Sequence, residues 1–436
     1  MSREMKDSGV EWIGEIPEDW DVKRIKHAVV QMGSGTTPNS DNSNFYDGNI
    51  AWIQSGDLYN TPIITKTSKT VTEQAIQRCS ALKIYHKPYI VIAMYGASVG
   101  NVSIASIDAC TNQACCIIKP NDNNNIDYLK YWLEVCKTDF IRKSVGGGQP
   151  NISQDKVREQ TYLCPSPTEQ QQIVHFLDRK CTAIDTAIEK TKKSIEKLEE
   201  YKKAVITKAV TKGIDPNAKM KDSGVEWIGE IPENWEIRRI KTVGTYRNGL
   251  TYSPDDLTDE TKGTLVLRSS NIKDGKLVLQ DNLYVRTYIS DKLRVQKGDI
   301  LICSRNGSRA LIGKNTLIDS DMDASFGAFM MIYRSKDPYY IHWVLKSEMM
   351  SYYLASFTTS TINQLIGSEF GNMYLPWPSN IQERQQISNY LNSKCSSIDA
   401  LVTRKQETIN KWEEYKKSLI YYAVTGKIDC RKEVIE

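Results

Sequence analysis

The sequence repeats itself, and this repeat constrains the fold more than any other feature. Residues 5–26 (MKDSGVEWIGEIPEDWDVKRIK) and residues 220–241 (MKDSGVEWIGEIPENWEIRRIK) are identical at 18 of 22 positions. Residues 169–215 and 383–429 are identical at 22 of 47 positions. The two offsets, 215 and 214, agree within one residue. The 436-residue chain therefore consists of two copies of one sequence of about 215 residues.

The segments between these matched ends differ in sequence but share an order of expected elements. Each starts with a stretch rich in Gly, Ser, Thr and Asn, continues with short β-like runs and one helix, and ends with a polar loop. In the first copy we expect strands at residues 89–94 and 114–119, a helix at 126–143 and a loop at 146–153. In the second copy we expect strands at residues 265–268, 299–303 and 328–333, a helix at 339–356 and a loop at 358–364. This order predicts one mixed α/β domain in each copy, and hence an α+β chain.

The matched segment that ends each copy is predicted to be helical. Thr168 and Gln171 have the spacing of a capping box. A second such signal, at residues 182–185 and 396–399, predicts that each helix restarts there. About 28 residues would then remain, which corresponds to a helix about 42 Å long. Gly213 and Pro216 are expected to end the first helix.

These helices carry apolar residues at alternating steps of four and three, which is typical of a coiled-coil seam. The predicted seam residues are Leu177, Cys181, Ile184, Ile188, Thr191, Ile195, Leu198, Lys202, Val205 and Ala209, and then Leu391, Cys395, Ile398, Val402, Lys405, Ile409, Trp412, Lys416, Leu419 and Ala423. One helix cannot bury such a seam alone, but two copies can bury each other. A closed two-fold arrangement makes the helices antiparallel and predicts two globular heads at opposite ends of a rod. The expected domains are residues 1–168, 169–215, 216–382 and 383–436.

Composition excludes several classes of protein. Lys and Arg total 57 against 53 Asp and Glu, so the chain is not a polybasic nucleic-acid coat. Ten Cys, none in a C-x-x-C pair, and no signal peptide predict reduced thiols in the cytoplasm. The uncharged run at residues 88–107 contains Gly and Ser and predicts two strands around a turn, and no membrane span.

Motifs that suggest catalysis are incomplete. Residues 96–100 (GASVG) match the nucleophile elbow G-x-S-x-G, but a strand is expected after them where that motif needs a helix. None of the four histidines, His27, His86, His175 and His342, has a persuasive Asp context. Residues 307–314 resemble a phosphate-binding loop with the wrong glycine spacing and without its Ser or Thr. Cys115 and Cys116 lie in an apolar strand and predict buried thiols. We therefore predict no catalytic, cofactor or metal site.

The matched openings (GVEWIGEIPEDW), the glycine-rich loop with PNIS, the run EQQQI and the long helix that ends near TKGID together resemble the specificity subunit of type I restriction–modification systems. The resemblance covers essentially the whole chain and both copies. It implies a non-catalytic subunit with two target recognition domains on two antiparallel helices, bound to a bipartite sequence in double-stranded DNA. It also implies two methyltransferase subunits, which transfer a methyl group from S-adenosylmethionine to adenine N6, and restriction subunits that use ATP and Mg. The chain itself is expected to hold none of these cofactors.

Polar, Arg and aromatic side chains in the loops of each head are candidate DNA contacts, because such groups bind base edges and phosphates. The candidates in the first head are Ser34, Thr36, Thr37, Gln54, Ser55, Tyr95, Ser98, Gln149 and Asn151. Those in the second head are Arg247, Asn248, Arg268, Ser269, Asn271, Arg305, Asn306, Arg309 and Gln364. Residues 1–168 carry 17 basic and 18 acidic groups, and residues 216–382 carry 20 and 19. With so little net charge, contacts to base edges must provide the discrimination.

The matched openings predict a different role for their tryptophans. Trp12, Trp20, Trp227 and Trp235 are the same in both copies although the heads differ, so we expect them to attach each head to the helices. The charged helix faces are most simply explained as solvated surface, and the resemblance implies that these faces and the helix ends are candidates for methyltransferase docking. Two alternatives remain open, namely a scaffold that binds only protein and a hydrolase that uses Ser98.

Overall fold

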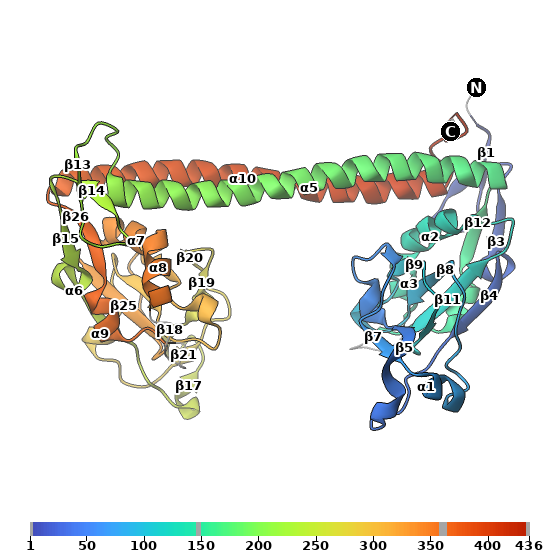
Figure 1. The fold of residues 1–436 in the computed structure, drawn as a ribbon, viewed down its shortest axis with the longest axis horizontal. Helices are drawn as coiled ribbons and strands as arrows, with labels where there is room; N and C mark the ends of the chain where they lie inside the picture. Colours follow the sequence, from blue (N-terminus) through green and yellow to red (C-terminus); the bar gives the residue numbers. More distant parts are fainter. Residues whose placement is uncertain (1–2, 145–149, 357–363, 433–436) are drawn as a thin grey trace. The chain divides into compact units, whose positions relative to one another are not determined.

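The computed structural model describes residues 3–144, 150–356 and 364–432. The chain divides into two compact units, one formed by Met1–Lys190 with Glu407–Glu436 and the other by Thr191–Gln406. Figure 1 shows that each unit contains a globular head, which combines strands and short helices, and a segment of each of two long helices. The two long helices are α5 (Pro167–Lys212) and α10 (Ile381–Val424).

The first head is built on two sheets. A five-stranded sheet has the order β4-β11-β8-β9-β6, and a three-stranded sheet has the order β10-β5-β7. The strands are β4 (Val29–Ser34), β5 (Tyr46–Ile53), β6 (Ile63–Ile64), β7 (Lys69–Val71), β8 (Tyr89–Ala93), β9 (Val102–Ala105), β10 (Ala109–Thr111) and β11 (Cys115–Pro120). The short helices are α1 (Glu73–Arg78), α2 (Ile126–Val135), α3 (Lys137–Lys143) and α4 (Gln154–Arg158). All five residues of β8 are buried, because α2 packs on one side of the sheet and residues from β5 and β10 share a core with the other side.

The second head has a similar plan. Its two four-stranded sheets have the orders β16-β25-β22-β23 and β17-β21-β18-β24, and β19 pairs with β20. The strands are β16 (Gly244–Asn248), β17 (Leu257–Thr258), β18 (Thr264–Leu267), β19 (Ile272–Lys273), β20 (Lys276–Leu277), β21 (Tyr284–Val285), β22 (Ile300–Cys303), β23 (Asn315–Leu317), β24 (Ala324–Phe326) and β25 (Met330–Ser335). The helices are α6 (Ile240–Val243), α7 (Pro338–Lys346), α8 (Glu348–Ser356) and α9 (Gly367–Asn372).

The two heads share a framework despite their different sequences. The antiparallel order β4-β11-β8-β9 corresponds to β16-β25-β22-β23. The parallel pair of β5 and β10 likewise corresponds to the parallel pair of β18 and β24. The single helix expected in each copy is interrupted, at Cys136 between α2 and α3 and at Ser347 between α7 and α8. The sequence prediction of one mixed α/β domain in each copy is confirmed.

The long helices are continuous, and the predicted restart is wrong. Helix α5 has 46 residues and α10 has 44, which corresponds to about 69 Å and 66 Å instead of 42 Å. At the expected restart points, the Oγ1 of Thr186 donates to the carbonyl of Thr182 (2.8 Å), and the Oγ of Ser397 donates to that of Ser393 (3.0 Å). Within a helix, a Ser or Thr hydroxyl can donate to the backbone carbonyl four residues earlier. Residue types that favour a helix cap can therefore also be accommodated in the middle of a helix.

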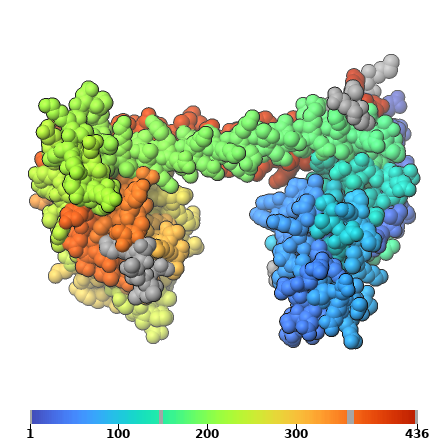
Figure 2. Space-filling view, viewed as in Figure 1, coloured from blue at the N-terminus to red at the C-terminus, as the bar shows by residue number. Residues whose placement is uncertain are grey.

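Within each unit, α5 and α10 run antiparallel, and Figure 2 shows them side by side. In the first unit, the Nζ of Lys416 contacts both carboxylate oxygens of Asp185 at 2.7 Å, and the Nε2 of Gln172 donates to the carbonyl of Arg431 (3.0 Å). From Gln172 to Asp185 the residue number rises along α5, while the partner's number falls from Arg431, just after α10, to Lys416 within it. In the second unit, Lys202 pairs with Asp399 at 2.5 Å, and Val210 shares a core with Leu391.

The predicted seam residues differ in burial. Those that are buried are Leu177, Cys181, Ile184, Ile188, Ala209, Leu391, Cys395, Ile398, Ile409, Leu419 and Ala423. Ile195, Leu198, Val205 and Val402 are half-buried. Trp412 does not fit the seam, since it is 37% exposed and its ring packs on Tyr415 of the same helix. The equivalent position in the first copy carries the smaller side chain of Leu198, which is half-buried.

The matched openings attach each head to the helices. The role predicted for their tryptophans is confirmed for Trp20 and Trp235, whereas the rings of Trp12 and Trp227 pack on Trp132 and Tyr353 of the heads. Each opening is a hairpin, formed by β1 (Met5–Asp7) and β2 (Glu15–Pro17) or by β13 (Met220–Asp222) and β14 (Glu230–Pro232). Each hairpin leads into a strand that pairs with the strand preceding the long helix. In the first copy β3 (Asp21–Arg24) pairs with β12 (Thr161–Cys164), and in the second β15 (Trp235–Arg239) pairs with β26 (Tyr374–Pro378). The indole N–H of Trp20 donates to Glu169 (3.0 Å), and that of Trp235 donates to Glu383 (2.8 Å).

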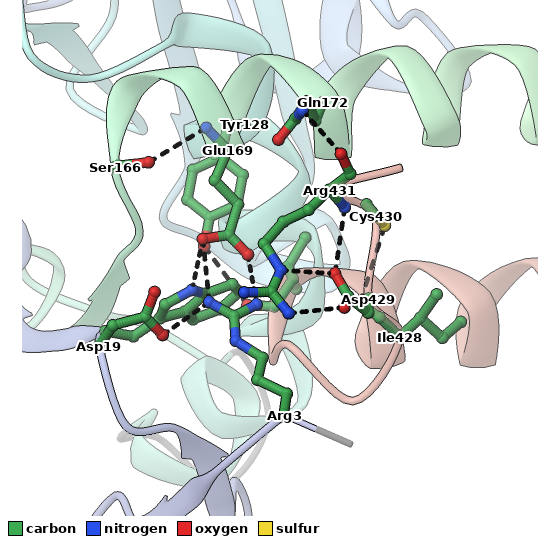
Figure 3. A network of polar contacts seen from close by, with 12 residues as sticks. Arg3, Asp19, Tyr128, Ser166, Glu169, Gln172, Ile428, Asp429, Cys430 and Arg431 are labelled. Atoms are coloured by element: carbon green, nitrogen blue, oxygen red, sulfur yellow. Dashed lines mark hydrogen bonds and ion pairs between the residues drawn. The ribbon is translucent and has the colours of Figure 1, made fainter. Parts of the chain in front are cut away.

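Other contacts complete the attachment in the first unit. Arg3 bonds both Glu169 and Asp19, and Figure 3 shows these groups converging beside Arg431. The hydroxyl of Tyr421 near the end of α10 donates to the carbonyl of Trp12 at 2.9 Å. The first head is therefore fixed both to the beginning of α5 and to the end of α10.

The two equivalent tryptophans make a matched test. In the variant Trp235→Phe, Glu383 loses its closest donor, and among the described residues the more distant amide of Asn234 (3.4 Å) remains, so we expect a loss of about 1.5–3 kcal/mol in the second unit. In Trp20→Phe, Arg3 still pairs with Glu169, and we expect a smaller loss. Urea-dependent hydrogen exchange of hairpins β13–β14 and β1–β2 measures both. A larger loss for Trp20→Phe would contradict the assigned role of Arg3.

Candidate nucleic-acid interface

Several loops of the first head meet at one edge of its five-stranded sheet. Strands β4 and β8 end there and β11 begins there, because Ser34 pairs with Cys116 and Ala93 with Cys115. The loops at this edge are residues 34–38, 94–101 and 112–114, joined by residues 54–58 and 150–154. We call this set the first polar edge. Strands that alternate in direction bring their connecting loops together in this way.

Hydrogen bonds hold these loops against one another. The N–H of Gly96 donates to the carbonyl of Pro150 (2.8 Å), and the N–H of Ile152 donates to that of Met94 (2.9 Å). These bonds bring Tyr95 opposite Asn151. The hydroxyl of Thr37 bonds Gln113 (2.7 Å), and that of Ser34 bonds Gln154 (3.4 Å).

The remaining candidates of the first head also lie at this edge. Gln54 precedes the short 3₁₀ helix η3 (Ser55–Leu58), and its N–H donates to the carboxylate of Asp57 (2.8 Å). The N–H of Asn112 donates to the carbonyl of Ile53, which connects that turn to the edge. Thr36 is half-buried in the loop after β4, and the hydroxyl of Ser98 donates to the carbonyl of Tyr95 at 2.9 Å. Gln149 lies outside the described residues.

The second head has a corresponding second polar edge, formed by residues 248–253, 268–271, 304–314, 327–329 and 364–365. Asn248 at the end of β16 pairs with Met331, and Cys303 at the end of β22 pairs with Met330. The N–H of Leu365 donates to the carbonyl of Ser304 (2.7 Å), which places Gln364 opposite Arg305. This pair corresponds to Asn151 and Tyr95 in the first head.

The candidates of the second head lie at or beside this edge. Arg247 and Asn248 are exposed at the end of β16, and Arg309 is exposed at the start of the 3₁₀ helix η8 (Arg309–Leu311). The amide of Asn306 donates to the hydroxyl of Ser269 at 3.3 Å. The guanidinium of Arg268 donates to the carbonyl of Asp281 at 2.6 Å, so this side chain is partly used within the head.

Asn271 is wrongly predicted as a DNA contact. It is 0% exposed; its side chain accepts a hydrogen bond from the N–H of Arg268 (2.9 Å) and donates to the carbonyl of Val278 (3.1 Å). It closes the turn η6 (Ser269–Asn271), as Asp57 closes η3 in the first head. A polar residue in a loop can hold the loop together instead of facing a ligand.

Phe329 is a surface residue that the sequence prediction missed. A strand was expected at residues 328–333, which would place Phe329 in a sheet. The strand β25 instead starts at Met330, and Phe329 lies in the loop with 59% of its surface exposed. Its place directly after Gly327 and Ala328 was the available signal, because glycine commonly marks a turn before a strand.

The chemistry of the two edges favours binding over reaction. Burial raises the pKa of Cys116 to about 12 and also raises that of Cys303, so both thiols stay protonated and are poor nucleophiles. His86, which bonds Asp108 at 2.8 Å, precedes β8, whereas Ser98 follows it, and a five-residue strand separates them by roughly 16 Å. The Ser98 hydrolase alternative therefore lacks its histidine at this edge.

Two further observations concern the described part of the chain. Within residues 3–144, 150–356 and 364–432, no group of three or more His, Cys, Asp or Glu side chains is placed to hold a metal ion. None of the helices in the same ranges combines the length and apolar character that crossing a bilayer requires. The edges present mainly amide, hydroxyl, guanidinium and aromatic groups, which suit the base edges and phosphates of nucleic acid.

Comparison with known proteins is consistent with this interpretation. The type I restriction modification DNA specificity domain matches residues 17–200 and 232–411. The chain is 28% identical over 303 residues to the type I restriction enzyme MjaIX specificity subunit of Methanocaldococcus jannaschii, covering 68% of each chain. It is 24% identical over 424 residues to the MjaVIII specificity subunit of the same organism, covering 95% of this chain and 94% of that protein.

Solved structures share the fold. A chain from a type I restriction–modification system, in a study of complex assembly and conformational transition, matches with a TM-score of 0.73 and 14% identity, covering 95% of this chain and 99% of that chain. The HsdS subunit from Thermoanaerobacter tengcongensis matches with a TM-score of 0.51 and 14% identity, covering 95% and 98%.

Two glycines test the shared framework of the edges. A Cβ added to Gly35 would lie 1.7 Å from the carbonyl oxygen of Thr111, and one added to Gly249 would lie 2.2 Å from that of Phe326. Gly35→Ala and Gly249→Ala should therefore each destabilise their own head by about 1–3 kcal/mol or more. Thermal unfolding with hydrogen exchange in each head measures this. Gly56→Ala is the matched control, since nothing lies within 4 Å of its added Cβ, and an equal loss in the control would contradict the close approach.

Proposed function

Because the chain belongs to the type I restriction–modification DNA specificity family, we propose that it binds a bipartite target in double-stranded DNA through its two polar edges. The first edge binds one half of the target and the second edge binds the other half. The chain acts by recognition and performs no catalysis of its own.

One observation carries this proposal, namely that a shared framework presents different side chains at equivalent positions. Gln54 precedes a turn that Asp57 closes, and Arg268 precedes the equivalent turn, which Asn271 closes. Tyr95 and Arg305 both follow the central strand of the sheet. A protein that bound the same ligand twice would be expected to keep these residues, whereas two different half-targets require them to differ.

The charge distribution supports recognition through base edges. The regions of the two heads carry 17 basic against 18 acidic groups and 20 against 19. Phosphate contacts, which provide most non-specific affinity, are therefore limited. We infer that the chain alone binds DNA weakly and gains specific affinity in a complex.

We infer that the partners are two methyltransferase subunits, which methylate adenine N6, and restriction subunits. The solved neighbour with a TM-score of 0.73 belongs to a type I system studied for its complex assembly, which supports a complex of this kind. S-adenosylmethionine, ATP and Mg would then be bound by the partner subunits. The complex would act in the cytoplasm, without a membrane partner.

An exchange of heads tests the proposal. The domain boundaries at residues 168/169, 215/216 and 382/383 remain predictions, and each exchanged block ends at one of them. Residues 27–168 are replaced by the corresponding block of a relative, and methylated adenines are mapped in DNA from cells that contain the assembled complex. We expect one half of the target to change and the other to stay the same.

The reciprocal exchange of residues 242–382 is the matched control and should change only the other half. A swap that alters both halves would mean that the heads do not recognise DNA independently. Unchanged methylation after both swaps would favour a scaffold that binds only protein.

A further inference from the structure

An arginine lies over an exposed aromatic ring at the second polar edge. Arg305 follows β22, and its Cζ lies 5.2 Å from the ring centroid of Phe329. The backbone fixes this arrangement, since the N–H groups of Ser304 and Arg305 donate to the carbonyl of Phe329 at 3.0 and 3.1 Å. Both side chains are exposed. The pair is thus held at the surface by the shared framework and not by chance contact of two flexible loops.

The guanidinium of Arg305 is available for a ligand. Among the residues that the structure describes, none forms a hydrogen bond or an ion pair with it. Arg268 at the same edge differs, because its guanidinium donates to the carbonyl of Asp281. Stacking on a ring occupies one face of a guanidinium and leaves the N–H groups along its edge free.

We propose that Arg305 recognises a guanine in the major groove of the second half-target and that Phe329 is its positioning residue. This inference rests on the proposed function. Two parallel N–H donors match the O6 and N7 acceptors of guanine, and no other base presents this pair of acceptors in the major groove. A phosphate requires only a positive charge within reach, whereas a base edge requires the donor plane to be fixed. The ring of Phe329 fixes that plane.

The first head has no such pair at the equivalent place. Tyr95 corresponds to Arg305, because each is the second residue after the central strand. Ala114 corresponds to Phe329, because the N–H of Met94 donates to the carbonyl of Ala114 (2.7 Å) as that of Ser304 donates to Phe329. The guanine contact is therefore specific to the second half-target.

The experiment uses the complex assembled with its methyltransferase partners. Methylated adenines are first mapped to define the target of the wild-type complex. A complex that methylates no specific sequence would refute the proposed function before any variant is tested. Duplexes with the mapped target, with single-base changes and with 7-deazaguanine at each guanine of the second half are then compared by competition binding at one salt concentration.

We expect one guanine of the second half at which replacement, or loss of N7 in 7-deazaguanine, weakens binding about 5- to 150-fold. In complexes with Arg305→Ala that discrimination should disappear, and with Arg305→Lys it should weaken, because the flexible ammonium of Lys has N–H donors but not the planar pair of the guanidinium. Arg309→Ala, which removes the same charge from the same loop, should weaken binding to all duplexes by one factor and leave the discrimination intact. Discrimination that persists in Arg305→Ala, or is lost equally in Arg309→Ala, would overturn the assignment.

The role of Phe329 has a separate readout. Phe329→Ala should reduce the guanine discrimination severalfold. Phe329→Tyr should retain the wild-type discrimination, because its ring can still support the guanidinium. In the Arg305→Ala background, Phe329→Ala should have no further effect on discrimination, since the ring acts through Arg305. An additive effect in the double variant would show that Phe329 contacts DNA independently and is not a positioning residue.

Discussion

The burial of apolar side chains between α5 and α10 is the constraint on which the rest of the molecule depends. Both helices are mostly polar, and neither could bury its apolar positions alone. Within each unit they run antiparallel, with Lys416 against Asp185 in the first and Lys202 against Asp399 in the second. These are equivalent residues of the two copies, so a parallel pair would bring lysine to lysine and aspartate to aspartate. Partly exposed ion pairs contribute little stability, so burial stabilises the pairing while charge favours one orientation.

The repeat separates attachment from recognition. The residues that fix a head to the helices, such as Trp20 with Glu169 and Trp235 with Glu383, are the same in both copies and lie away from the polar edges. The edges lie at the ends of the sheet strands, where loops can change without disturbing the core. A change of target then requires new side chains at the edge and no new attachment. This division explains how two heads with little sequence similarity can retain one framework.

Much of this organisation was predictable from the sequence because the repeat reports it directly. The matched openings indicated attachment, and polar loops between apolar strands indicated where the edges lie. Other features depend on which of several possible hydrogen bonds a side chain makes, and the sequence pattern does not decide this. Thr182 has the spacing of a helix cap, but helix α5 continues through it because its neighbours can bond within the helix. Asn271 was expected to contact DNA but is buried, and Phe329 was expected in a strand but lies exposed in a loop. The amide is needed to close a turn, and strand β25 begins two residues later than its apolar run suggests.

The central claim is that the two polar edges, on their common framework, are the surfaces that contact DNA. Hydrogen–deuterium exchange of the assembled complex, with and without its target duplex, tests this most directly. The account predicts slower exchange at both edges, in peptides that include residues 94–101 and 304–314, and little change in hairpins β1–β2 and β13–β14. Protection confined to helices α5 and α10, with both edges unchanged on addition of DNA, would contradict it.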